Sequence, residues 1–137
     1  MRGCSGQLLA ELLTKTLTDE ESSELAQVVA FEEVKAAMFR IDGEKAPGPD
    51  GYTAHFYRSC WSIVGQDVVD TVLHFFSTMD LLPAFNSTIV SLVPKSKNHN
   101  SIRDFRPISC CTMVYKCITK VLANKIKKVL PGVIRKN

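Results

Sequence analysis

The sequence has no apolar run that approaches the roughly 20 residues a membrane-spanning helix needs. Near the N-terminus, Glu11 and Lys15 interrupt the only apolar patch, so no secretory signal is predicted. From these absences we predict a soluble, intracellular protein of the cytoplasm or nucleus, with no membrane partner.

Paired cysteines and metal-ligand spacings are also missing. The 137 residues contain five cysteines, an odd number, with no CxxC pair, and the three histidines stand at no ligand spacing to them. The sequence therefore predicts free, buried thiols in a reducing compartment and no metal site. A nucleophile elbow, a Walker loop and an HExxH motif are absent as well, so the sequence has no motif for the kinds of catalysis that these three motifs support.

A strong charge excess is lacking, since the net charge is only +3. The basic residues nevertheless gather near the C-terminus, where no acid accompanies Lys116, Lys120, Lys125, Lys127, Lys128, Arg135 and Lys136. Such a face attracts phosphate backbones. It is equally typical of the solvated side of a helix with cations near its C-terminal end. Charge alone leaves both interpretations open.

Apolar residues recur at helical spacing along most of the chain. They predict helices over Gln7–Thr16, from a Thr18–Glu21 capping box through Leu25, and over Phe31–Ile41, Tyr52–Val64, Gln66–Phe76 and Met113–Leu130. Gly65 is expected to break the chain between two of these helices, and Pro131 with Gly132 to end the last one. The apolar stripes indicate core packing rather than ligand binding.

A compact loop, DGEKAPGPDG, runs from Asp42 to Gly51. Its prolines and glycines predict tight turns, and Asp50 is expected to cap the helix that follows. One interpretation has Lys45 and the backbone amides around Gly48 contacting nucleic acid. In the other, the loop only orients two helices.

Two short runs, Thr88–Val93 and Asp104–Ser109, predict an antiparallel hairpin closed by a polar loop over Ser96–Ser101. Because proline cannot donate to a central ladder, Pro94 and Pro107 place these strands at an edge or near their ends. The hairpin would carry Lys95 on one strand and Arg106 on the other, a plausible grip for a phosphate chain. The alternative is a solvated hairpin tip. Together the elements predict an α+β fold, mostly helical with one β-hairpin.

The amino-acid sequences of these segments resemble those of a known family. LVPKSKN, DFRPIS and YKCITKVLANKIKKVLP, with KAPGPDG upstream, resemble the fingers region of reverse transcriptases from non-LTR (LINE-type) retrotransposons, the plant kind in particular. The resemblance covers roughly the last three-quarters of the chain. It implies a fingers region over residues 31–137, preceded by a helical lead-in over residues 1–30.

The resemblance also implies roles for individual residues. Lys95 and Arg106 would meet the triphosphate of an incoming deoxynucleotide, with Lys45 and Lys97 as secondary candidates for template or phosphate contact. RNA or DNA and the deoxynucleotide would be the partners of the complete domain.

Catalysis in this family needs two metal ions held by aspartates of the palm subdomain, including an adjacent Asp-Asp pair. This sequence has no Asp-Asp pair. We therefore expect a partial domain without the palm, inactive alone, with no catalytic residue or cofactor of its own and Mg²⁺ expected only with the missing palm. Apolar surface shaped for the palm would favour self-association. The alternatives are a non-enzymatic nucleic-acid-binding remnant and a helical protein–protein adaptor.

Overall fold

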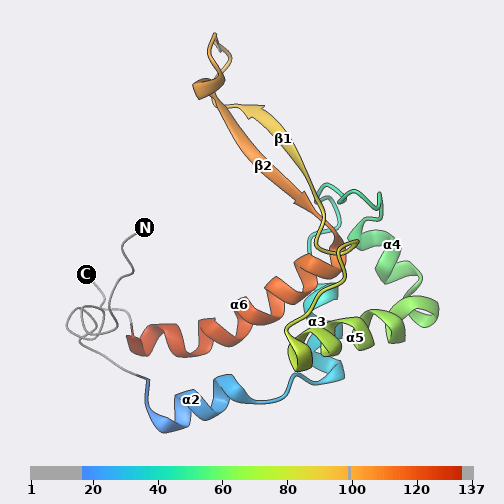
Figure 1. The fold of residues 1–137 in the computed structure, drawn as a ribbon, viewed down its shortest axis with the longest axis vertical. Helices are drawn as coiled ribbons and strands as arrows, with labels where there is room; N and C mark the ends of the chain where they lie inside the picture. Colours follow the sequence, from blue (N-terminus) through green and yellow to red (C-terminus); the bar gives the residue numbers. More distant parts are fainter. Residues whose placement is uncertain (1–16, 99, 134–137) are drawn as a thin grey trace. The chain divides into compact units, whose positions relative to one another are not determined.

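The computed structural model describes residues 17–98 and 100–133. In chain order, the elements are α2 (Asp19–Ala26), α3 (Phe31–Phe39), α4 (Ala54–Ser59), α5 (Trp61–Thr78), β1 (Thr88–Pro94), the 3₁₀ turn η1 (Ile102–Asp104), β2 (Phe105–Cys111) and α6 (Met113–Val133), shown in Figure 1. The predicted mixture of helices with an antiparallel hairpin is confirmed. The helix predicted over Gln7–Thr16 lies outside the described residues. No described helix is long and apolar enough to cross a membrane.

The chain divides into two compact units. One comprises Val28–Leu122, and the other combines the chain up to Gln27 with the chain from Ala123 onward. Helix α6 therefore contributes its first part to one unit and its second part to the other.

The unit Val28–Leu122 is built on one apolar core. Figure 1 shows α3, α4 and α5 gathered at the end of α6 from which the hairpin departs. Buried side chains come from each helix at helical spacing, chiefly Val34, Ala37 and Met38 of α3, Ala54 and Tyr57 of α4, Val68, Val69 and Val72 of α5, and Met113, Val114, Cys117, Ile118 and Val121 of α6. Most of the apolar positions on these helices are thus core, as their periodicity predicts. The prediction is wrong for Phe31 and Leu122, which are exposed.

The break between α4 and α5 lies at Cys60, so the predicted break at Gly65 is wrong. Gly65 is buried inside α5, where a Cβ atom would come within 2.8 Å of the Trp61 ring. The glycine provides room for the indole instead of ending the helix. A glycine stands at position 65 because there is no space for a side chain, and not because the helix is interrupted there.

Two helix ends also differ from the sequence-based expectation. Thr53, not Asp50, caps α4, since its hydroxyl accepts from the Phe56 N–H at 3.4 Å. The Asp50 carboxylate instead accepts from the Tyr52 N–H within the preceding turn, at 3.3 Å. Helix α6 continues through Pro131 to Val133, so the predicted end at Pro131 and Gly132 is wrong. Pro131 lies in the last turn, where the fixed φ of proline is still helical and only one intrahelical hydrogen bond is lost.

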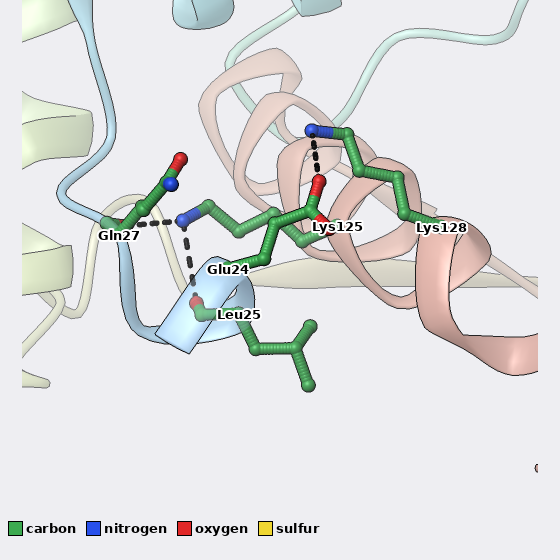
Figure 2. Close-up of polar contacts among 5 residues, drawn as sticks. All are labelled: Glu24, Leu25, Gln27, Lys125 and Lys128. Atoms are coloured by element: carbon green, nitrogen blue, oxygen red, sulfur yellow. Dashed lines mark hydrogen bonds and ion pairs between the residues drawn. The ribbon is translucent and has the colours of Figure 1, made fainter. Parts of the chain in front are cut away.

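The described part of the second unit begins with the predicted capping box. The Thr18 hydroxyl accepts from the Glu21 N–H at 3.2 Å, and the Glu21 carboxylate accepts from the Thr18 N–H at 2.9 Å. At the other end of α2, the Lys125 ammonium donates to the carbonyls of Leu25 and Gln27 (Figure 2). A lysine thus satisfies carbonyls that the end of a helix leaves unpaired.

An ion pair accompanies this contact, with Lys128 Nζ 3.1 Å from the Glu24 carboxylate (Figure 2). Both side chains are about half exposed, so solvent screens the pair and its contribution to stability is small.

Cys117 is the thiol that the core encloses. Burial raises its pKa from 9.0 to about 12, and Sγ donates to the Val34 carbonyl at 3.6 Å. Cys60, Cys110 and Cys111 are free and partly exposed. All four thiols are free, as predicted, but the predicted burial is confirmed only for Cys117 and is wrong for the other three.

We predict that iodoacetamide at about pH 8 labels Cys60, Cys110 and Cys111 while sparing Cys117 until the chain unfolds. Because the folded pKa exceeds the unfolded one, the contribution of this thiol to stability is present below pH 9.0 and is lost as the pH rises toward about 12. Peptide-resolved mass spectrometry, with and without guanidinium, measures the labelling. Native labelling of Cys117 at the rate of Cys60 would contradict the assignment.

Candidate functional site

The hairpin is a two-stranded antiparallel ribbon that projects away from α3, α4 and α5 of the same unit (Figure 1). Its pairing runs from Thr88 opposite Cys111 at the base to Pro94 opposite Phe105 at the far end. At about 3.3 Å per residue, the paired segment is on the order of 20 Å long. Each proline lies on an edge strand, as predicted, and the second strand runs Phe105–Cys111 rather than Asp104–Ser109.

Side chains and backbone close the tip of the hairpin together. The Asp104 carboxylate accepts from the N–H groups of Asn100 and Ser101 at 3.0 and 2.9 Å, and the Ser101 hydroxyl accepts from the Arg103 N–H at 3.4 Å. These bonds form a capping box around η1. Sequence reasoning missed this turn, although Ser101 and Asp104 stand at capping-box spacing.

Lys95 and Arg106 both lie at this end of the ribbon. Arg106 pairs with Val93, and the Lys95 N–H donates to the Asp104 carbonyl at 2.7 Å, which extends the pairing by one position. Alternate residues of a strand share a face, so the register assigns Lys95 to the same face as Val93 and Arg106. The structure brings the two predicted cations to one end of the hairpin.

The two cations differ in how they are held. Lys95 Nζ donates to the Arg103 carbonyl at 2.6 Å, which uses one of the three donors of the ammonium. No acceptor among the described residues meets the Arg106 guanidinium. Lys97 follows Lys95 in the exposed turn at the tip. Their contact with phosphate stays a prediction.

The KAPGPDG loop lies at the opposite end, at the base of the hairpin. Gly48 is buried there, so close that a Cβ atom would come within 2.5 Å of the Thr112 nitrogen. Lys116 Nζ donates to the Ala46 carbonyl at 2.6 Å and fixes the same loop from α6. Lys45 is exposed on this loop, whereas Arg106 lies near the far end of the hairpin. The structure therefore groups Lys95, Lys97 and Arg106, and it places Lys45 on a different element.

Thr112 joins the hairpin to the helices. Its buried hydroxyl donates to the Phe85 carbonyl at 2.8 Å and accepts from the Tyr115 N–H at 3.3 Å. Phe85 precedes β1 and Thr112 follows β2, so one hydroxyl bridges the entry and the exit of the ribbon and also caps α6. No sequence pattern that we considered singled out this residue.

The basic stretch of α6 is only partly available to a partner. Lys116, Lys125 and Lys128 each have an acceptor within the chain. Lys120 and Lys127 have none among the described residues, and Arg135 and Lys136 lie outside them. Within residues 17–98 and 100–133, no three His, Cys, Asp or Glu side chains gather closely enough to hold a metal ion.

Comparison with known proteins gives a distant similarity. No family model matches the sequence. The chain is 26% identical over 118 residues to the "Transposon TX1 uncharacterized 149 kDa protein" of Xenopus laevis. The match covers 86% of this chain but only 9% of that protein, so the chain spans less than a tenth of the length of this relative.

We predict that Gly48→Ala lowers the free energy of unfolding by about 1–3 kcal/mol, because the new methyl group would overlap backbone atoms that cannot rotate away. Gly43→Ala is the matched control, since its Cβ would meet Arg58 Nη2, the far end of a flexible side chain, at 2.7 Å. Chemical denaturation measures both variants. Equal stabilities of the two would show that the loop does not pack against Thr112.

Proposed function

We propose that this chain is a retrotransposon-derived segment of a reverse transcriptase, corresponding to part of the fingers region of a non-LTR element. The observation that carries the proposal is the pairing register, which brings Lys95 and Arg106 to one end and one face of the hairpin. The resemblance of LVPKSKN and DFRPIS to that family supports it. The similarity to a protein named for a transposon supports the origin.

In this proposal the hairpin binds the triphosphate of an incoming deoxynucleotide. The Arg106 guanidinium has no acceptor among the described residues, and its planar fork can reach two phosphate oxygens at once. Lys95 adds a point charge that tolerates small displacements. The capped turn at the tip limits the motion of both, which lowers the entropy lost when a ligand binds.

The proposed role is binding and orientation. The residues of this chain do not fit a two-metal site, because its sequence has no Asp-Asp pair and the described carboxylates do not cluster. Nucleotide transfer would depend on a palm subdomain outside this sequence, and Mg²⁺ would belong to that subdomain.

A non-enzymatic nucleic-acid-binding role is the second candidate. It is favoured by the exposed Lys127 and the half-exposed Lys120 on α6, which have no acceptor among the described residues. Such cations contact phosphates without reading bases.

We predict that Arg106→Ala raises the KM for nucleotide and lowers kcat, a loss of about 2–4 kcal/mol in transition-state stabilisation. The measurement needs an active enzyme, either a relative that carries this hairpin or this chain joined to its palm. Arg106→Lys should also be impaired, because lysine has no fork, whereas Lys95→Arg should retain part of the activity.

Arg103→Ala is the matched control at the same tip and should change the kinetics within about 0.5 kcal/mol. Primer–template affinity should stay constant in each variant. An Arg106→Ala enzyme that keeps both its fold and its nucleotide kinetics would show that this residue is structural.

For the second candidate, we predict weak binding to single-stranded RNA that ignores sequence and falls steeply between about 50 and 200 mM salt. Lys127→Gln should lower the salt slope by about 1. Its neighbour Lys128 is already paired with Glu24, so Lys128→Gln should have a smaller effect. Fluorescence anisotropy measures both. Binding that is indifferent to salt would instead favour an adaptor that uses apolar contacts.

A further inference from the structure

A pocket of about 300 Å³ lies within the unit Val28–Leu122, on a part of the chain that the proposed function does not use. Four aromatic rings, Tyr52, Phe56, Tyr57 and Phe85, line it together with aliphatic side chains that include Val68. The volume is at the lower end of the range for small-ligand pockets. It therefore suits one side chain or one small heterocycle.

Tyr52, Phe56 and Tyr57 contact one another. Tyr52 and Phe56 are stacked with centroids 4.4 Å apart, and Tyr57 meets them edge-on at 6.4 and 5.5 Å. Tyr52 is 49% exposed, so part of its surface is open to a ligand. The face of an aromatic ring carries negative potential and attracts a cation placed over it.

The charge that lines the pocket is negative, and so is the electrostatic potential at the ring faces. Of the described residues that line it, Asp67 alone is charged, and it is exposed on α5. Asp50 lies close enough to the Tyr57 phenol that its negative charge, after burial, helps to raise the pKa of that group. A ligand with a positive end on an apolar stem therefore complements the pocket.

We propose that this pocket receives an arginine side chain presented by another polypeptide. The guanidinium stacks on Tyr52 and pairs with the Asp67 carboxylate, while the aliphatic stem contacts the apolar wall. Arginine suits the site better than lysine because its planar, weakly hydrated group stacks on a ring and forms two parallel bonds to one carboxylate.

The test is an NMR titration of the isotopically labelled chain with two probes, N-acetyl-arginine amide and N-acetyl-citrulline amide. The probes differ in one positive charge and share nearly the same shape. The arginine probe should bind about tenfold more tightly, from the sum of a cation–π contact and one ion pair. It should shift the amide signals of Tyr52, Phe56 and Asp67.

Variants of the pocket distinguish the contribution of its negative charge from that of its aromatic surface. Asp67→Asn should remove the preference for the arginine probe, whereas Asp70→Asn should retain it. Asp70 lies on the same helix, where its carboxylate accepts from Gln66 Nε2 at 2.9 Å, and it does not line the pocket. Tyr52→Leu should weaken the arginine probe more than the citrulline probe, because it removes a ring face and keeps an apolar side chain.

Three outcomes would overturn the proposal: equal affinities of the two probes, a preference that survives in Asp67→Asn, and shifts confined to residues outside the pocket. Cytidine serves as a neutral aromatic probe. If cytidine shifted the same signals at lower concentration than the arginine probe, the pocket would be a site for a flat neutral ring instead. An unchanged spectrum outside the pocket verifies that each variant is folded.

Discussion

The buried hydroxyl of Thr112 makes the contacts on which the arrangement of the unit Val28–Leu122 depends. A hydroxyl enclosed without partners would be costly, so both of its hydrogen bonds must form when the unit folds. One bond holds the segment before β1 and the other begins α6. Because Gly48 packs against the same backbone, the loop, the hairpin and the helix meet at this position.

This junction explains how a hairpin that is largely exposed to solvent is held in place. An isolated two-stranded hairpin is marginally stable in water, and every residue of β1 is exposed. The base is anchored at Thr112, and the tip is closed by Asp104 and the Lys95 ammonium. With both ends held, the register between them fixes where Arg106 lies relative to Lys95, which is what a phosphate-binding role requires.

The sequence predicts local features of this fold well, because short-range chemistry decides them. The capping box at Thr18, the apolar stripe of α3 and the edge prolines of the hairpin follow from spacing alone. Long-range contacts decided the rest. Gly65 looks like a helix breaker until Trp61 is seen packed against it, and nothing near Gly48 indicates that Thr112 lies beside it. The aromatic pocket was missed for the same reason, since its rings resemble ordinary core residues in the sequence.

The packing of Trp61 also has a spectroscopic consequence. Trp61 is the sole tryptophan of the chain, and its ring lies edge-on to Phe39 of α3 with centroids 5.4 Å apart. Intrinsic indole fluorescence therefore reports on the packing of α3 against α5. The hairpin carries no tryptophan, so its opening is silent in that signal, and comparing fluorescence with circular dichroism separates melting of the helical core from fraying of the ribbon.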